Sequence, residues 1–162
     1  MAGWREFEAE APELAGEVRA RMAAHKHKVL ATLRKDGSPR VSGVETEVVA
    51  GDLWLGMMDR SVKALDLKRD PRMALHIGSP DAPHDPAEWE GDAKVAGRAV
   101  EVTDEAARRR FLGALPQAPP GPFDLFRVDV AEVVLTRVGS PADHLLIEFW
   151  RPGEDVRRVE RK

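Results

Sequence analysis

The stretch 33–68, LRKDGSPRVSGVETEVVAGDLWLGMMDRSVKALDLK, constrains the fold more than any other part of this sequence. Short β-rich runs alternate in it with turn signals, in the order strand, turn, strand, turn, strand, helix. Turns are predicted at KDGSP (35–39) and AGD (50–52), because glycine accepts a positive φ and proline interrupts a strand ladder. Strands over 29–33, 40–49 and 53–58 then form two consecutive hairpins, which make an antiparallel meander.

The helix that follows this meander begins at Ser61, which precedes apolar residues at helical spacing and suits an N-cap. This order of elements brings Arg40, Ser61 and Lys63 to one edge of the sheet. A guanidinium, an ammonium and a hydroxyl beside free backbone N–H groups are suited to holding a phosphate. From spacing alone, a simpler interpretation is favoured, in which Arg40 and Lys63 face solvent and Ser61 only caps the helix.

Gly56, Met57 and Met58 end the third strand just before this helix. Glycine at such a position lets a planar ligand approach the backbone, and methionine side chains pack well against a ring. Core packing is the competing interpretation, and it is favoured for the two methionines.

The remaining chain predicts one domain over residues 1–162, with a helical segment at 1–27. Apolar residues at spacings of three and four predict a helix over 12–24, with Trp4 and Phe7 packing from the segment before it. A second helix is expected after Thr103 or Asp104, with its solvent side formed by Arg108, Arg109 and Arg110. Further strands are expected at 73–77, 93–102, 125–135 (with a bend near Ala131), 144–150 and 156–160.

So many short antiparallel strands with few helices predict a mainly β fold. Closing the sheet into a barrel covered by helices removes exposed strand edges, so an antiparallel barrel is expected. The Pro-rich segment 116–122 is interpreted as a linker within the domain. The long loop 78–92 is of the kind that is either disordered or part of a site.

The composition excludes several classes of function. The chain has no cysteine, which rules out disulfides, thiolate nucleophiles and cysteine-ligated metals, so redox chemistry requires a bound cofactor. A formal charge of −3 argues against nucleic-acid binding. The basic cluster at 157–162 is interpreted as a solvated tail. The five histidines show no spacing typical of a metal site, so none is expected.

The N-terminus is too acidic for a signal peptide, and no apolar run reaches the roughly 20 residues of a membrane-spanning helix. We therefore expect a cytoplasmic protein that does not interact with membranes.

Several segments taken in order resemble one protein family. VLATLRKDGSPRVSG, GDLWLGMMDRSVKALDLKRDPRMALHI, AKVAGRAVEVTDE, LFRVDVAEVVLTRVG and HLLIEFWRPGEDVRRVERK are similar to the pyridoxamine 5'-phosphate oxidase-like proteins, the FMN-binding split barrels. The resemblance runs from about residue 29 to the C-terminus. It implies an antiparallel split β-barrel and a homodimer that binds two cofactors at the subunit interface.

The resemblance also implies a set of cofactor-binding residues. Arg40, Ser61 and Lys63 correspond to residues that bind the flavin phosphate in this family. The flavin ring would lie along the strands that carry Val41, Ser42, Gly43, Gly56 and Met57. Looser matches fall at Lys94 and Trp150.

Departures from the family pattern limit what the resemblance implies. The end of the chain, WRPGEDVRRVERK, differs from the arginine-containing terminus of true pyridoxamine phosphate oxidases, so pyridoxal phosphate synthesis is not expected. Some relatives bind the deazaflavin F420 or haem, and Met57 stands where a flavin-stacking threonine is common. We expect a flavin-dependent oxidoreductase that transfers hydride to or from a small organic substrate, and no catalytic acid or base is identified.

Two alternatives stay open. One is an F420-dependent reductase. The other is a non-catalytic protein that binds flavin or haem, with His25, His27 or His144 as the candidate axial ligand.

Overall fold

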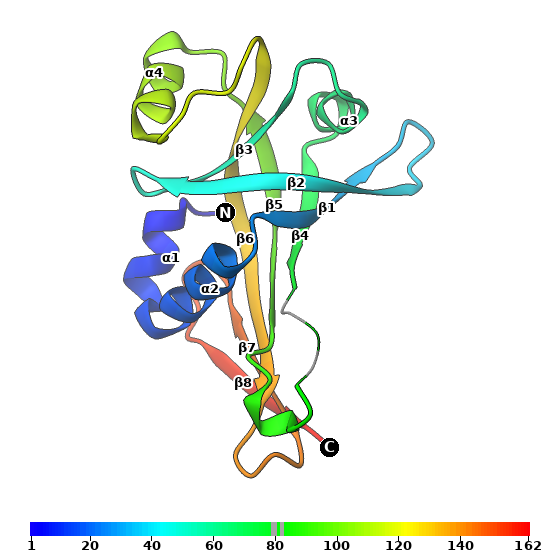
Figure 1. The fold of residues 1–162 in the computed structure, drawn as a ribbon, viewed down its shortest axis with the longest axis vertical. Helices are drawn as coiled ribbons and strands as arrows, with labels where there is room; N and C mark the ends of the chain where they lie inside the picture. Colours follow the sequence, from blue (N-terminus) through cyan, green and yellow to red (C-terminus); the bar gives the residue numbers. More distant parts are fainter. Residues whose placement is uncertain (79–80, 82) are drawn as a thin grey trace.

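The chain folds around a closed antiparallel barrel, seen in a computed structural model that describes residues 1–78, 81 and 83–162. The barrel strands follow the order β3-β2-β1-β4-β5-β6, and β6 pairs with β3 to close it (Figure 1). These strands are β1 (His27–Leu33), β2 (Pro39–Val49), β3 (Asp52–Met58), β4 (Arg72–Ile77), β5 (Asp92–Glu101) and β6 (Phe123–Val138). The predicted meander and the predicted barrel are both confirmed.

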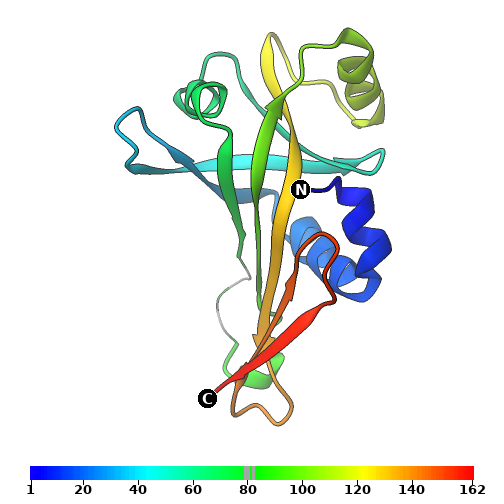
Figure 2. The same cartoon turned by 180° about the vertical axis from the view of Figure 1, so that it is seen from behind.

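Strand β6 is long enough to pair with β3 near its start and with β7 near its end. Its first residues, Phe123 to Arg127, pair with β3, whereas its last residues, Val133 to Val138, pair with β7 (Leu145–Trp150). Strand β8 (Arg157–Arg161) then pairs with β7, and the resulting hairpin extends away from the barrel (Figure 2). Strand β6 therefore joins the closed barrel to the additional strands β7 and β8.

A β-bulge redirects β6 between these two pairings. The register passes from Ala96 opposite Glu132 to Gly97 opposite Val130, so Ala131 has no partner in this ladder. A bend near Ala131 was expected, and the bulge is its physical form. A Cβ atom on Gly97 would lie 2.2 Å from the Asp129 carbonyl oxygen, so only glycine fits the close approach.

The N-terminal segment forms two helices, α1 (Trp4–Glu10) and α2 (Pro12–Ala24), which pack between the barrel and the β7–β8 hairpin (Figures 1 and 2). The predicted helix at 12–24 is confirmed. The ring centroids of Trp4 and Phe7 lie 5.1 Å apart, and those of Phe7 and Trp150 lie 4.8 Å apart. All three side chains are fully buried, so the helical segment shares the main core with the barrel.

Two further helices lie near the other end of the barrel. Helix α3 (Val62–Arg69) follows β3, and α4 (Glu105–Ala114) follows β5. Asp104 caps α4 by accepting a hydrogen bond from the Ala107 N–H. Phe111 of α4 packs over Trp54, with the ring centroids 5.4 Å apart, so α4 covers the outer face of β3.

Two sequence-based expectations are wrong. Arg108 does not face solvent, because it donates hydrogen bonds to the carbonyl oxygens of Val102 and Phe123 and its guanidinium lies 4.5 Å from the Phe123 ring centroid. The basic cluster at 157–162 is not a free tail, because most of it forms β8 and Arg158 pairs with the buried Glu148. Both errors arise because contacts distant in sequence override local polarity.

The loop at 78–92 contains one 3-10 turn, Pro86–Glu88, and residues 79, 80 and 82 of this loop lie outside the described residues. Among the helices that the structure describes, none has the length and apolar character needed to cross a membrane.

Candidate functional site

The N-terminus of α3 presents unused hydrogen-bonding groups. Ser61 holds the N-cap position, but its side chain makes no cap hydrogen bond. The Ser61 Oγ atom is buried and has no hydrogen-bond partner among the described residues. Ser61 is therefore at the predicted position without the predicted capping bond. Because an unpaired buried hydroxyl costs free energy, this atom is suited to a ligand that supplies the missing partner.

Lys63 lies beside this serine and contacts the barrel. Its Nζ donates a 2.7 Å hydrogen bond to the Gly43 carbonyl oxygen on β2. This hydrogen bond is exposed, so Lys63 faces solvent and contacts β2 at the same time. The contact places an ammonium group between the start of α3 and the outer edge of β2.

Arg40 is fixed by a buried carboxylate rather than extended into solvent. Its Nε donates a 2.6 Å hydrogen bond to Asp66 on α3, and Asp66 also accepts hydrogen bonds from Thr32 and Arg69. Burial raises the pKa of Asp66, but the hydrogen bonds from Arg40, Arg69 and Thr32 outweigh it and hold the pKa below its ordinary value. Asp66 is thus ionised at neutral pH and fixes the direction of Arg40.

The charges around α3 favour an anion. Arg40, Lys63 and Arg69 carry three positive charges against the single carboxylate of Asp66. No hydrogen bond from the described residues occupies the two Nη atoms of Arg40. The first N–H groups of a helix also lack intrahelical acceptors, and the helix dipole adds positive potential there. A phosphate fits this combination of donors and charge.

The loop before α3 is held in place from β6. Arg60 has a positive φ of 55°, and its N–H donates a 2.8 Å hydrogen bond to Asp124. Lys68 on α3 forms a 2.7 Å ion pair with the same carboxylate. The start of α3 is therefore fixed relative to the barrel before any ligand binds.

A cavity of about 810 Å³ adjoins the Lys63 ammonium. Its floor is the outer face of β2 and β3, where Gly43 and Gly56 have no neighbouring atom within 4 Å of a Cβ position. Its wall is the segment between α4 and β6, with Phe111, Leu115, Pro116, Gln117, Ala118, Pro119, Pro120, Pro122 and Phe123 as lining residues. The volume lies within the range of roughly 300–1,000 Å³ that is typical of small-molecule sites.

The structure brings together only part of the predicted cofactor site. Gly43, Gly56, Met57 and Lys63 line the cavity, and the Met57 side chain also belongs to the main core. Arg40 and Ser61 are not among the residues that line the cavity; Arg40 contacts α3 through Asp66, and Ser61 precedes α3. Val41 is 68% exposed on the outer face of β2, and the neighbouring Ser42 is half-buried.

Lys94 and Trp150 do not line this cavity. Lys94 lies on β5, opposite His76 and Val134. Trp150 is fully buried and donates a hydrogen bond to Glu10, so it has no surface to offer a ligand in this chain. These were the two loosest matches to the family pattern.

Sequence reasoning missed several residues of the site. Asp66 reads as an ordinary polar position of a short helix, and the segment 116–122 reads as a linker because its prolines break regular structure. Glu47 lines the cavity from β2, but alternation alone only predicts that its side chain leaves the core. No group of three or more His, Asp or Glu residues that could hold a metal ion occurs in the described part of the chain.

Comparison with solved structures shows shared folds at low identity. The heme binding protein from Mycobacterium smegmatis is 23% identical, with a TM-score of 0.60 over 91% of this chain and 58% of that one. PhzG from Burkholderia lata, in complex with tetrahydrophenazine-1-carboxylic acid, is 17% identical, with a TM-score of 0.56 over 92% and 88%. HutZ, the heme storage protein from Vibrio cholerae, is 16% identical, with a TM-score of 0.53 over 72% and 89%.

At these identities the structural similarity concerns the fold, and the chain spans just over half the length of the mycobacterial protein. No match to a curated protein was found. A family model described as pyridoxamine 5'-phosphate oxidase matches residues 14–137, which form most of the sequence. This chain therefore belongs to the pyridoxamine 5'-phosphate oxidase family, as its sequence segments predict.

Proposed function

We propose that this protein binds FMN and acts as a flavin-dependent oxidoreductase on a small organic substrate. The observation that carries the proposal is the buried Ser61 Oγ at the start of α3, which has no partner among the described residues. Lys63 follows two residues later, and Asp66 of the same helix holds Arg40. These groups would bind the flavin phosphate. The bare backbone at Gly43 and Gly56 offers a flat surface for a planar ring.

A bound flavin would supply the hydride-transfer chemistry, because amino-acid side chains do not carry out hydride transfer by themselves. The chain contributes binding and orientation. Asp66 holds Arg40, Asp124 holds the loop before α3, and the apolar wall at 115–123 keeps water from one side of the cavity.

Removing the phosphate donors is expected to weaken FMN binding. Ser61→Ala deletes one hydroxyl, and Lys63→Met deletes one charge while keeping a side chain of similar length. Because hydrogen bonds to charged groups contribute about 1.5–3 kcal/mol, Lys63→Met is expected to raise the Kd for FMN roughly 10- to 100-fold. Quenching of flavin fluorescence measures the Kd.

Lys35→Met is the matched control, because Lys35 is an exposed residue of the 35–39 turn, outside the cavity lining. Equal Kd values for the Lys63 and Lys35 variants, or no FMN binding by the unmodified protein, would contradict the proposed site. Mass spectrometry of the small molecule that co-purifies with the protein distinguishes FMN from F420. Stopped-flow reduction by NADPH or by reduced F420 then separates an enzyme from a protein that only binds the cofactor.

Haem binding is the second candidate, because two of the similar structures are a heme binding protein and a heme storage protein. Of the three histidines considered as axial ligands, His27 lines the cavity, with its Nε2 atom 3.3 Å from Glu45. His144 instead contacts Asp143 in the loop between β6 and β7. A Soret band that appears when haem is added and disappears in His27→Ala, but not in His144→Ala, would favour haem over FMN.

We also propose that two copies of the chain pair through the outer face of the barrel, with the cofactor between them. Val41 is 68% and Met58 77% exposed, and the register places Val29, also exposed, opposite Gly43 on the same face. A second copy would cover this apolar face, since Met58 connects it to the cavity.

Sedimentation equilibrium is expected to give twice the monomer mass for the unmodified protein and the monomer mass for Val41→Glu. Leu145→Glu, which adds a charge at an exposed position on β7, is expected to remain a dimer. A monomeric unmodified protein would contradict the proposed pairing.

A further inference from the structure

Glu47, on the floor of the cavity, has a carboxylate without an ion-pair partner among the described residues. It lies on β2 and lines the cavity together with Glu45. Glu45 forms an ion pair with Lys26 at 3.3 Å, and its carboxylate lies 3.3 Å from the His27 Nε2 atom. The Glu47 backbone pairs with Trp54 in the β2–β3 ladder, but no ion pair or hydrogen bond joins its carboxylate to another residue in the described ranges. The buried Lys28 lies within electrostatic range of this carboxylate. The two neighbouring carboxylates therefore differ in what they can offer a ligand.

The wall formed by residues 116–122 offers few hydrogen-bond donors that would compete with a ligand for the Glu47 carboxylate. Four of the seven residues at 116–122 are prolines, which have no backbone N–H to donate. The segment thus presents apolar surface and carbonyl oxygens toward the cavity, and Phe111, Leu115 and Phe123 extend this apolar lining. Glu47 itself is exposed, so solvent screens its charge, and a ligand bound between Glu47 and this apolar wall would displace part of that solvent.

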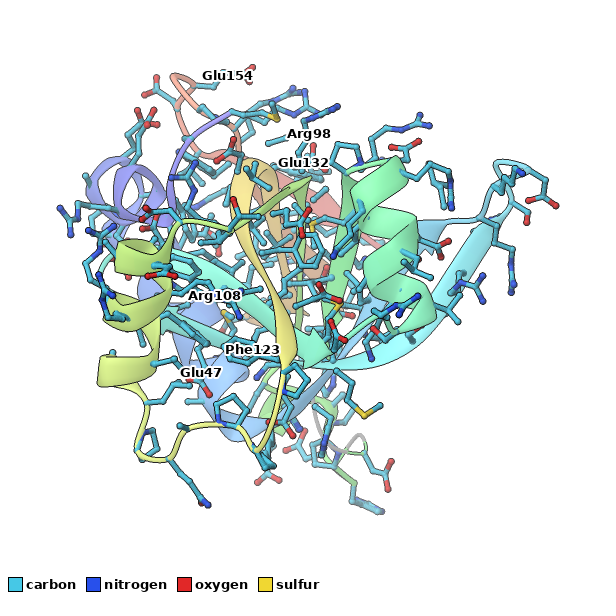
Figure 3. All side chains as sticks on the ribbon, turned by 90° about the horizontal axis from the view of Figure 1, so that it is seen from above. Glu47, Arg98, Arg108, Phe123, Glu132 and Glu154 are labelled. Carbon is cyan, nitrogen blue, oxygen red and sulfur yellow. The ribbon has the colours of Figure 1, made fainter. Side chains whose placement is uncertain are left out.

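Arg108 keeps this wall in position. It donates hydrogen bonds to the carbonyl oxygens of Val102, where β5 ends, and Phe123, where β6 begins. Its guanidinium also packs on the Phe123 ring, and Figure 3 shows both side chains between α4 and β6, with Glu47 nearby. The wall is therefore preorganised, which lowers the cost of binding a ligand against it.

The cavity has opposite charges at two places along one strand. The Lys63 ammonium contacts Gly43, and Glu47 lies four residues further along β2. At roughly 3.3 Å per residue, about 13 Å separate the two positions on the strand. The Lys63 end favours an anion, as argued for the phosphate, whereas the Glu47 end favours a cation.

We propose that the Glu47 end of the cavity is a binding subsite for an organic cation, a planar apolar molecule that carries an amidinium or a protonated amine. This inference rests on the proposed function in one respect, because it takes the cation to be the substrate that lies beside the flavin. Binding of the cation does not depend on the flavin, because it requires only the Glu47 carboxylate and the apolar wall at 115–123.

Three planar probes of nearly equal shape test the subsite: benzamidine, which is cationic, benzamide, which is neutral, and benzoate, which is anionic. Ligand-observed NMR titrations are run on the full chain, with and without saturating FMN. We expect benzamidine to bind about fivefold tighter than benzamide, with benzoate the weakest. Glu47→Gln is expected to abolish this preference. Glu45→Gln is the matched control and is expected to keep it, because the Glu45 carboxylate already has partners.

The outcomes separate the two proposals. FMN binding without a preference for benzamidine, or a preference that survives in Glu47→Gln, overturns the cation subsite and leaves the proposed function intact. A Glu47-dependent preference in a protein that does not bind FMN overturns the proposed function and leaves the subsite intact. Failure of all three probes to bind also overturns the subsite.

Discussion

Replacing Trp150 by alanine is expected to lower the free energy of unfolding by about 3–5 kcal/mol, the range found when large aromatic residues are removed from a packed core. Trp150 is fully buried, stacks on Phe7 and donates a 3.0 Å hydrogen bond to Glu10. Its loss would remove the contact that joins β7 to the N-terminal helices. Urea denaturation followed by circular dichroism measures the change.

Trp150→Phe separates this structural role from a role in cofactor binding. Phenylalanine keeps most of the ring packing but loses the hydrogen bond to Glu10, so we expect a smaller loss of about 1–2 kcal/mol. Because Trp150 has no surface in the cavity, the folded variant is expected to bind FMN with an unchanged Kd. A tenfold rise in the Kd for FMN in a stable Trp150→Phe protein would contradict this expectation. It would show that Trp150 contributes to cofactor binding, as the sequence resemblance implies, as well as to the core.

Local patterns in the sequence were sufficient to predict much of the fold. The helix at 12–24 is amphipathic and begins with Pro12, and its bounds agree with α2. The turns at 35–39 and 50–52 contain the glycines that adopt positive φ, Gly37 and Gly51. In each case the residues that determine the element lie within the element, so no knowledge of distant contacts is needed.

The parts that could not be predicted depend on contacts between distant segments. Asp66 acquires its role from Thr32 and Arg40, which are 34 and 26 residues away in the chain. Arg108 turns inward because Phe123 supplies both a carbonyl oxygen and a ring. The Pro-rich segment becomes a cavity wall only because α4 packs on Trp54. A charged or proline-rich stretch reads as exposed or irregular until these long-range partners are known.

The candidate phosphate site depends both on local sequence patterns and on contacts between distant segments. The positions of Ser61 and Lys63 follow from a local helix signal, and the family resemblance adds Arg40. The reason that Arg40 can serve the site is Asp66, which orients its guanidinium while leaving the Nη atoms without partners among the described residues. Asp66 would therefore link the stability of α3 to the proposed binding of an anion.

Replacing Asp66 by alanine is expected to lower the free energy of unfolding by about 3–5 kcal/mol, because it leaves Arg40 and Arg69 beside an apolar gap without their counter-charge. Asp66 is 2% exposed, so water does not replace the lost carboxylate easily. Asp66→Asn keeps the shape and loses only the charge. In this variant we also expect weaker FMN binding, since Arg40 is no longer held in one direction.

Asp70→Asn is the matched control. The Asp70 carboxylate pairs with Arg72 at the surface, and hydrogen bonds from Arg72 lower its pKa to about 2. Exposed ion pairs of this kind contribute little to stability because solvent screens them, so the control is expected to be nearly as stable as the unmodified protein. Equal losses in the Asp66 and Asp70 variants would show that the buried network contributes nothing specific.

The pH dependence provides an independent check on Asp66. Its pKa in the folded protein lies below the ordinary value of 3.8, so its contribution is fully present at a pH well above 3.8 and disappears as the pH falls through the folded-state pKa. The difference in unfolding free energy between the unmodified protein and Asp66→Asn should therefore be largest near neutral pH and shrink in acid. Urea denaturation of both proteins at neutral pH and at a series of acidic values measures this difference. A constant difference across that range would mean that Asp66 stabilises the fold through shape alone, and Arg40 would then need another source of orientation.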